Sequence, residues 1–154
     1  MSSDFDFLGE AILEARRAQD EGEVPIGAVL VSDGQIIGRG HNRKETLRDP
    51  TAHAEMEAIR SAIGSFASWR NERCTIYVTL EPCPMCAGAI LQARIDRVVY
   101  GCPDPKAGAA ATLFRLLDDE RLNHRCEVVA GVREDECRAL LTEFFVKQRK
   151  QGKK

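Results

Sequence analysis

The sequence predicts an α/β protein, a three-layer α/β/α sandwich in which helices cover both faces of a mixed central sheet. Three observations support this prediction. Helical and strand-like segments alternate along the chain, a two-residue turn near the N-terminus joins two strands into a hairpin, and neither a repeat nor a linker divides the 154 residues. A chain of this length forms one domain with a sizeable core. We therefore expect a single domain over residues 1–154.

Each expected element follows from a local pattern. Helices are predicted where apolar residues recur every three or four positions, and strands where apolar and β-branched residues run together between turn residues. Asp33-Gly34 is a strong hairpin signal, and Asp49-Pro50-Thr51 supplies the chemistry of a helix start. The expected helices cover about residues 5–22, 51–63, 87–95, 113–117 and 134–150, and the expected strands cover 26–31, 35–39, 75–80, 97–101 and 127–130, with a loop over about 40–49.

The charge of the chain is nearly balanced overall but uneven along it. Acidic residues number 24 and basic residues 22, and the formal net charge of −2 excludes a globally basic nucleic-acid-binding protein. Residues 143–154 form a basic C-terminal helix end or tail, with five basic side chains against Glu143. Such a tail is usually a solvated helix end whose cations favour the helix dipole. Contact with nucleic acid is the alternative interpretation.

The sequence also bears on where the protein works. No stretch approaches the roughly 18 apolar residues that a membrane-spanning helix needs, and Met1–Asp6 lacks the basic flank and apolar run of a signal peptide. We therefore expect a cytoplasmic protein without a membrane partner. The six cysteines do not resemble a secreted disulfide framework. Cys83 and Cys86 form a Cys-x-x-Cys pair, and the other four are expected to be buried small hydrophobic residues.

Four residues at two fixed spacings indicate a zinc site with hydrolytic chemistry. His53-Ala54-Glu55 and Pro82-Cys83-Pro84-Met85-Cys86 both have the pattern of a helix start. The imidazole of His53 and the thiolates of Cys83 and Cys86 suit zinc, and a fourth position can hold a water whose pKa the metal lowers to about 7. Glu55 is not needed as a ligand and can carry the proton of that water. This H-x-E…P-C-x-x-C arrangement is the signature of zinc-dependent nucleobase deaminases.

Two other interpretations of the cysteine pair stay open. The pair could be a redox site, although it does not follow a strand–helix entry near the N-terminus. A closed structural zinc site would need a fourth ligand. Taken alone, His53 and Glu55 would be ordinary residues, and their combination with Pro-Cys-x-x-Cys about 30 residues later favours the hydrolytic site. Candidates for a fourth ligand are His41, Cys74, Cys102 and His124.

Longer stretches around these residues resemble the cytidine-deaminase-like superfamily, and most closely its bacterial tRNA-specific adenosine deaminases of the TadA type. The resemblance runs from about residue 5 to residue 150. The zinc motif identifies the superfamily, and the other stretches indicate the branch. The resemblance implies the cytidine-deaminase-like form of the predicted sandwich. The stretches that carry it are Glu23–Val31, Asp49–Glu55, Thr79–Ala89, Arg97–Gly101, Asp104–Ala109, Leu122–His124 and Glu134–Cys137.

The resemblance implies a tRNA modification, the hydrolytic deamination of adenosine to inosine at the wobble position (34) of a tRNA anticodon. The enzyme would be a homodimer with one Zn²⁺ per subunit. His53, Cys83 and Cys86 would bind the zinc. Glu55 would deprotonate the zinc-bound water, protonate N1 of the adenine and return its proton to the departing ammonia.

The resemblance also implies five residues that bind the anticodon stem-loop. Asn42 would read the flipped base, and Asp104 and Lys106 would contact the sugar and the neighbouring backbone. Phe145 could stack on a flanking base, and Arg149 could contact phosphate. Without the resemblance, Asn42, Asp104 and Lys106 are typical of turns, and Phe145 is typical of a core position.

Two competing functions use the same residues. A deaminase of a small substrate such as guanine or cytosine would need the same zinc site and glutamate, but Asn42, the loop over 104–109 and the basic tail favour RNA. A zinc-stabilised RNA-binding module without catalysis would not need Glu55. For the RNA enzyme we expect a dimer to group the basic residues around the site, because the rest of the chain is acidic. These residues are Arg43, Lys44, Lys106 and the two tails.

Overall fold

The computed structural model describes residues 3–65, 70–71 and 73–152. Its strands form a five-stranded sheet in the order β2-β1-β3-β4-β5. β1 runs antiparallel to β2 and β3, whereas β3, β4 and β5 run parallel, so the predicted mixed sheet is confirmed. The elements are α1 (Asp4–Asp20), β1 (Gly27–Ser32), β2 (Gln35–His41), α2 (Lys44–Leu47), α3 (Ala54–Ser61), β3 (Cys74–Leu80), α4 (Pro84–Gln92), β4 (Arg97–Cys102), β5 (Glu127–Val129) and α5 (Glu134–Lys150).

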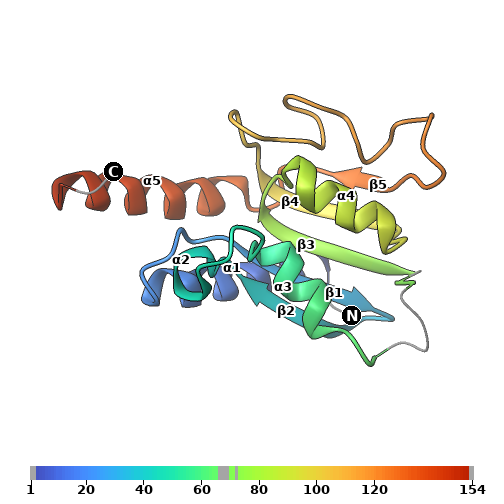
Figure 1. Cartoon of the computed structure of the whole chain (residues 1–154), viewed down its shortest axis with the longest axis horizontal. Coiled ribbons are helices and arrows are strands. Elements are labelled where there is room, and N and C mark those ends of the chain that lie inside the picture. Colours follow the sequence, from blue (N-terminus) through green and yellow to red (C-terminus); the bar gives the residue numbers. More distant parts are fainter. Residues whose placement is uncertain (1–2, 66–69, 72, 153–154) are drawn as a thin grey trace.

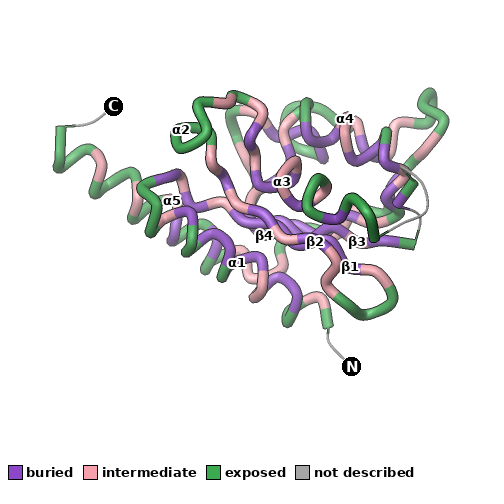
Figure 2. Tube along the Cα trace, turned by 60° about the horizontal axis from the view of Figure 1, so that its bottom comes forward, coloured by how far each residue is buried: buried purple, intermediate pink, exposed green. Residues whose placement is uncertain are grey.

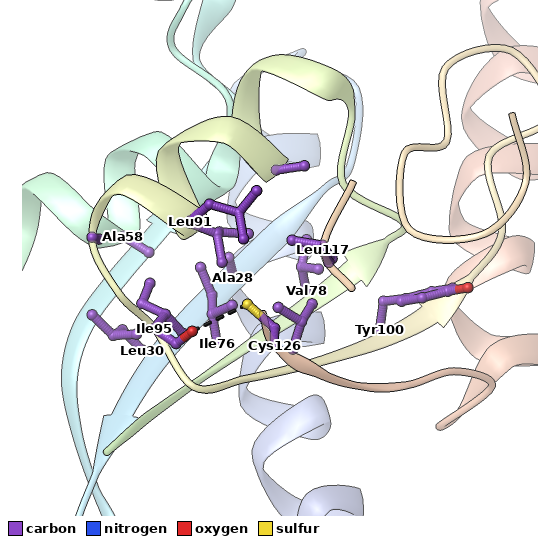
Figure 3. Close-up of a cluster of buried hydrophobic side chains, with 14 of the residues drawn as sticks. Ala28, Leu30, Ala58, Ile76, Val78, Leu91, Ile95, Tyr100, Leu117 and Cys126 are labelled. Atoms are coloured by element: carbon purple, nitrogen blue, oxygen red, sulfur yellow. Dashed lines mark hydrogen bonds between the residues drawn. The ribbon is translucent and has the colours of Figure 1, made fainter. Parts of the chain in front are cut away.

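Helices cover both faces of the sheet, and the predicted three layers are confirmed. α1 and α5 lie on one face, and α3 and α4 lie on the other (Figure 1, Figure 2). The alternation of side chains along β3 explains this arrangement, because Ile76 and Val78 point toward α3 and α4 while Tyr77 points toward α1. Figure 3 shows buried residues of the core cluster between the sheet and the helices α3 and α4, among them Ile76, Val78 and Leu91. Among the residues that the structure describes, none of the helices combines the length and the apolar character that a membrane-spanning helix needs.

The predicted hairpin and the predicted burial of four cysteines are confirmed. Asp33 and Gly34 both have a positive φ, 49° and 76°, as a two-residue type I′ turn requires. Asp has a short polar side chain that tolerates this conformation better than most residues do. The buried cysteines outside the Cys-x-x-Cys pair are Cys74, Cys102, Cys126 and Cys137.

Two glycines bring β2 and α3 into backbone contact. A Cβ atom on Gly38 would lie 2.3 Å from the carbonyl oxygen of Ala58, and one on Gly40 would lie 2.4 Å from the nitrogen of Ala58. No side chain fits between the strand and the helix at these positions. This contact sets the distance of α3 from the sheet, and with it the position of the first turn of the helix.

The predicted helix over 113–117 is wrong. The chain around it forms turns and irregular structure. The N–H groups of Ala111 and Thr112 donate to the carboxylate of Glu81 at 2.9 and 3.0 Å. These bonds hold the start of the segment on Glu81. The N–H groups of Leu113 and Phe114 then donate to the carbonyl group of Gly108 at 2.9 and 3.2 Å, and not to carbonyl groups four residues back as in an α-helix.

Two details around the predicted loop over 40–49 also differ. The short helix α2 lies inside this loop and was not predicted. The next helix starts at Ala54, which confirms His53-Ala54-Glu55 as the helix start and not Asp49-Pro50-Thr51. The carboxylate of Asp49 accepts hydrogen bonds from the N–H and the hydroxyl of Thr51, at 2.8 and 2.7 Å, and so closes a separate turn ahead of the helix.

Asp4 joins the start of α1 to the sheet. Its carboxylate accepts two hydrogen bonds from the guanidinium of Arg97 on β4, at 2.7 and 2.5 Å, and one from the hydroxyl of Tyr77 on β3 at 2.8 Å. The bond from Arg97 lowers the pKa of Asp4 and outweighs the opposite effect of burial. The ionised form of Asp4 is therefore favoured by folding.

Asp4→Asn is expected to lower the free energy of unfolding by about 1–2 kcal/mol near pH 7, because it weakens a charge-assisted pair that is partly exposed. Since the pKa of Asp4 is lowered in the folded state, this stabilisation is fully present above the ordinary pKa of 3.8 and is lost as the pH falls below it. Urea unfolding of both proteins at about pH 7 and about pH 3 measures the effect. If the free energies of unfolding of the parent and Asp4→Asn differed by the same amount at the two pH values, this account would be contradicted.

Candidate active site

His53, Cys83 and Cys86 come together from two segments of the chain. Among the described residues, they form a group of potential metal ligands whose donor atoms all lie within 4.8 Å of one another. Nδ1 of His53 lies 3.5 Å from the Sγ atom of Cys83 and 3.5 Å from that of Cys86. Zinc bonds of about 2.3 Å to sulfur and 2.0 Å to nitrogen, at a tetrahedral angle, put these atoms about 3.5 Å apart. The donor set therefore fits zinc in both chemistry and spacing.

Two helix N-termini present these ligands. His53 is the N-cap of α3 and Cys83 is the N-cap of α4, and both have extended backbone, with φ −77°, ψ 155° and φ −78°, ψ 172°. Pro84 occupies the first position of α4, where a helix needs no N–H, so α4 starts within Pro82–Cys86 as its helix-start pattern predicts, and earlier than residue 87 of the expected small-residue run. Cys86 lies in the first turn. The positive ends of two helix dipoles therefore favour the thiolate forms of the cysteines.

The cluster changes the pKa of each of its members. Hydrogen bonding from Cys86 lowers the pKa of Cys83 to about 4, against the effect of burial and with help from His53. The same contact with Cys83, together with burial, raises the pKa of Cys86. The hydrogen bond to Cys83 also raises the pKa of His53. Cys83 is therefore a thiolate near neutral pH, and a bound metal ion would replace the proton that Cys86 keeps.

Glu55 is buried beside this cluster, with 4% of its surface exposed. Burial raises the pKa of its carboxyl group to about 7. Glu55 lines a cavity of about 200 Å³ together with His53 and Cys83, and apolar side chains such as Val24 and Leu80 line other parts of the wall. A cavity with an apolar wall and a few convergent polar groups is typical of a small-molecule or base-binding site.

The five predicted substrate-binding residues all lie at this cavity or beside it. Asn42 and Asp104 line the cavity of Glu55. Lys106, Phe145 and Arg149 line a second cavity of about 520 Å³. Asp104 lines both, so the two cavities adjoin. Phe145 is 41% exposed, which excludes the core position that its spacing suggested.

Asn42 combines a turn position with a place in the cavity wall. Its Nδ2 donates to the carbonyl group of Val24 at 3.3 Å, and its Oδ1 accepts from the N–H of Lys44 at 3.2 Å. The side chain is 5% exposed. Its neighbour Lys44 also lines the cavity. The segment after β2 thus forms one wall of the site.

Two buried glutamates near the cavity were not predicted as functional residues. Glu81 accepts hydrogen bonds from the backbone of the loop over 104–112, and Glu23 accepts them from residues 45–46. Burial acts to raise the pKa of both carboxyl groups, but these hydrogen bonds outweigh it and leave each pKa below its usual range. The available sequence signal was an acidic residue next to an apolar segment, which is also typical of an ordinary surface position.

Within the described residues, no fourth protein ligand joins the cluster. His41 contacts the carboxylate of Glu14 instead, with 3.0 Å between the nearest atoms. His124 contacts the backbone carbonyl group of Ile95 at 2.7 Å. A three-donor set beside a cavity fits a hydrolytic zinc site better than a closed structural one. The remaining candidates, Cys74 and Cys102, are buried in the core.

The chain is similar to known proteins along almost its whole length. The profile of the MafB19-like deaminases matches residues 2–149. The tRNA-specific adenosine deaminase of Bacillus subtilis (strain 168) is 52% identical over 153 residues, which cover 99% of this chain and 95% of that protein. A protein of the same name from Haemophilus influenzae is 46% identical over 154 residues, covering 98% of this chain and 89% of that protein.

Solved structures share the fold. A chain from a study of A-to-I editing by tRNA:A34 deaminases at the wobble position of transfer RNA superimposes with a TM-score of 0.83. It is 46% identical, and the match covers 88% of this chain and 98% of that one. A guanine deaminase from Bacillus subtilis superimposes with a TM-score of 0.63 at 40% identity, over 73% of this chain and 71% of that one.

Proposed function

Because this chain belongs to the family of tRNA-specific adenosine deaminases, we propose that it hydrolyses adenosine to inosine at the wobble position, position 34, of a tRNA anticodon. One observation of the structure carries the proposal. The group of His53, Cys83 and Cys86 borders a cavity that also contains the buried carboxyl group of Glu55. This is the arrangement that hydrolytic removal of an amino group from a base needs.

His53, Cys83 and Cys86 would hold the metal, one zinc ion per subunit. Once bound, zinc would supply an activated water to the reaction. Glu55 would carry one proton from the attacking water to N1 of the adenine and a second from the new C6 hydroxyl to the departing amino group. Adenosine and water would thus become inosine and ammonia, and Glu55 would return to its starting state.

The adjoining cavities would hold the adenosine and its neighbours. Asn42 would contact the flipped base, and Asp104 and Lys106 would contact the sugar and the neighbouring backbone. Phe145 would stack on a flanking base, and Arg149 would contact phosphate. The position of all five residues around the two cavities supports this arrangement, as does the exposure of the Phe145 ring.

The enzyme would act as a homodimer in the cytoplasm, where its tRNA substrate is used in translation. Leu113 and Phe114 expose 51% and 52% of their surface, and a second copy of the chain could cover such apolar side chains. The dimer would group the basic residues Arg43, Lys44, Lys106 and those of the two tails around the site, because the rest of the chain is acidic. Equilibrium sedimentation of the zinc-loaded protein tests this part of the proposal.

The decisive experiment is an inosine assay on a synthetic anticodon stem-loop with adenosine at the wobble position. Free guanine, cytosine and adenosine are tested in parallel, and a stem-loop with the adenosine moved by one nucleotide is the matched control. Inosine formed at the wobble position alone would support the proposal. Ammonia released from a free base, with the RNA unchanged, would favour the small-substrate function to which the similarity with a guanine deaminase points.

Deleting residues 147–154 is expected to weaken RNA binding by about tenfold or more near physiological salt, because it removes basic side chains that can neutralise phosphates. α5 projects from the body of the protein (Figure 1), and its Arg149 lines the second cavity. Lys153 and Lys154 lie outside the described residues. Affinity for the stem-loop, measured over a series of salt concentrations, should also fall less steeply with salt after the deletion. Equal slopes for the two proteins would contradict a role of the tail in RNA binding.

A further inference from the structure

The carboxylate of Glu81 accepts hydrogen bonds from several donors of one loop, and the residue is buried at the edge of the cavity of Glu55, which it helps to line. Its Oε2 accepts from the N–H groups of Ala110, Ala111 and Thr112, at 3.0, 2.9 and 3.0 Å. Its Oε1 accepts from the N–H of Asp104 at 3.0 Å and from the hydroxyl of Thr112. The side chain therefore binds both ends of the segment over residues 104–112 and holds them at the C-terminal end of β3.

The loop is fitted around this carboxylate. A Cβ atom on Gly108 would lie 2.4 Å from Oε1 of Glu81 and 2.6 Å from Oε2, so only glycine fits at this position. The N–H of Ala109 donates to the carbonyl group of Pro82 at 2.8 Å and closes the loop against the start of α4. Asp104 and Ala107 of this loop line the cavity of Glu55.

Glu23 binds backbone N–H groups of the segment that forms the opposite wall of the cavity. Its carboxylate accepts from the N–H of Glu45 at 3.2 Å and from the N–H of Thr46 at 2.6 Å, both in α2. Like Glu81, Glu23 is 2% exposed. The segment that it holds starts with Asn42 and Lys44, which line the cavity on this side.

We propose that Glu81 and Glu23 are positioning residues for substrate, each of which holds one wall of the cavity through backbone N–H groups. Glu81 sets the place of Asp104, and Glu23 sets the place of Asn42. The inference rests on the proposed function, because it takes these two residues to contact the substrate nucleotide. Neither glutamate reacts with the substrate. Each acts through the residue that its loop presents.

A glutamine at position 81 would damage the wall at a defined point. Its amide nitrogen can only donate, so it cannot replace the oxygen that faces three N–H groups. It would instead take the place of Oε1, where the Thr112 hydroxyl can turn to accept a hydrogen bond. The N–H of Asp104 would then face an N–H₂ group and lose its partner. Glu81→Gln therefore releases Asp104 while much of the loop stays attached.

Double-mutant cycles test this inference with the zinc-loaded enzyme and the wobble-adenosine stem-loop. Glu81→Gln is expected to lower kcat/KM by about tenfold or more, because small displacements of a positioning group are costly. In an Asp104→Ala background, Glu81→Gln should lower kcat/KM by about twofold or less, since the contact of Asp104 with the substrate is already lost. In an Asn42→Ala background the full effect of Glu81→Gln should remain. Glu23→Gln should show the mirror pattern, coupled to Asn42 and independent of Asp104.

Three controls separate positioning from loss of the fold or the metal. Zinc content and melting temperature are measured for every variant, and zinc should stay at one ion per chain. Glu127→Gln, at an exposed glutamate of β5, should change kcat/KM by less than about twofold. If Glu81→Gln does not fold, Thr112→Val removes a single donor to Glu81, and Thr112→Ser restores it. The Thr112→Val variant should then show the coupling to Asp104, and the Thr112→Ser variant should not lower kcat/KM.

The outcomes distinguish the two proposals. A parent enzyme that forms no inosine in the stem-loop would overturn the proposed function. An active parent in which the effects of Glu81→Gln and Asp104→Ala simply multiply would overturn the inference alone. Loss of zinc in Glu81→Gln or in Thr112→Val would also overturn it, because the glutamate would then support the metal site rather than the wall.

Discussion

Glu55→Gln is expected to lower the rate of adenosine deamination by about 10²–10⁴-fold, the usual contribution of a general acid–base group. Glutamine has nearly the same shape as glutamate but cannot accept and release a proton in this way. Glu55 is buried beside His53 and Cys83, so the variant should still bind zinc and RNA. The inosine assay gives the rate, and metal analysis gives the zinc content of the same sample.

Glu57→Gln is the matched control for this prediction. Glu57 lies two positions further along α3, where its carboxylate faces Arg60 at 4.0 Å and does not line the cavity. Its substitution should change the rate by less than about twofold. A Glu55→Gln protein that binds zinc and RNA and still deaminates at the parental rate would exclude the proton-transfer role. Zinc and RNA binding by a parent without deaminase activity would instead favour a zinc-stabilised RNA-binding module.

Cys86→Ser is expected to abolish metal binding and activity together. Cys86 is completely buried and lies 3.5 Å from the imidazole of His53, and a serine hydroxyl is a much poorer zinc ligand than a thiolate. Loss of one of three protein ligands should reduce deamination by more than about 10³-fold. The melting temperature should also fall, because zinc that binds only the folded chain stabilises it. Metal analysis, the inosine assay and thermal unfolding measure the three effects.

Cys126→Ala tests whether the effect belongs to the metal site. Cys126 is also buried, but its sulfur contacts the backbone carbonyl group of Ile95 in the core cluster (Figure 3). This substitution should cost about 1 kcal/mol of stability, as a small core truncation does, and leave zinc content and activity in place. A Cys86→Ser protein that retains one zinc ion and parental activity would show that the metal binds elsewhere.

The layers of the fold could be predicted from the sequence because they depend on local periodicity. The β-branched and apolar residues along 75–80 predict a strand, and Asp33-Gly34 predicts a hairpin turn by its own conformational preference. The helix expected over 113–117 failed for a different reason. Its apolar spacing is compatible with a helix, but its N–H groups pair with Gly108 and Ala109 of the loop that Glu81, distant in the sequence, holds against the end of β3. Local patterns contain no information on such a distant partner.

The site residues also divide into those that a local pattern predicts and those whose role depends on a distant partner. His53 and Glu55 are two positions apart, and Cys83 and Cys86 are three apart, so the spacing itself limits which side chains can converge. The roles of Glu23 and Glu81 depend on donors 22 to 31 residues further along the chain. Nothing in the composition of the donor loops marks them, because backbone N–H groups are present almost everywhere. Only the folded arrangement shows which carboxylate meets which loop.

Glu81 and Glu23 hold the cavity walls largely through backbone hydrogen bonds, and this affects how the sequence around such a site can change. Every amino acid except proline carries the N–H group that Glu81 and Glu23 bind. The side chains at 45 and 111 are exposed, so they can be exchanged without removing a donor from Glu23 or Glu81, whereas the hydroxyl of Thr46 also hydrogen-bonds to Glu23. Substitutions there could alter how the outer surface meets different RNAs while the chamber around the reacting base keeps its shape. The scaffold therefore allows substrate preference to drift in evolution, or to be selected in a library, independently of the chemical step.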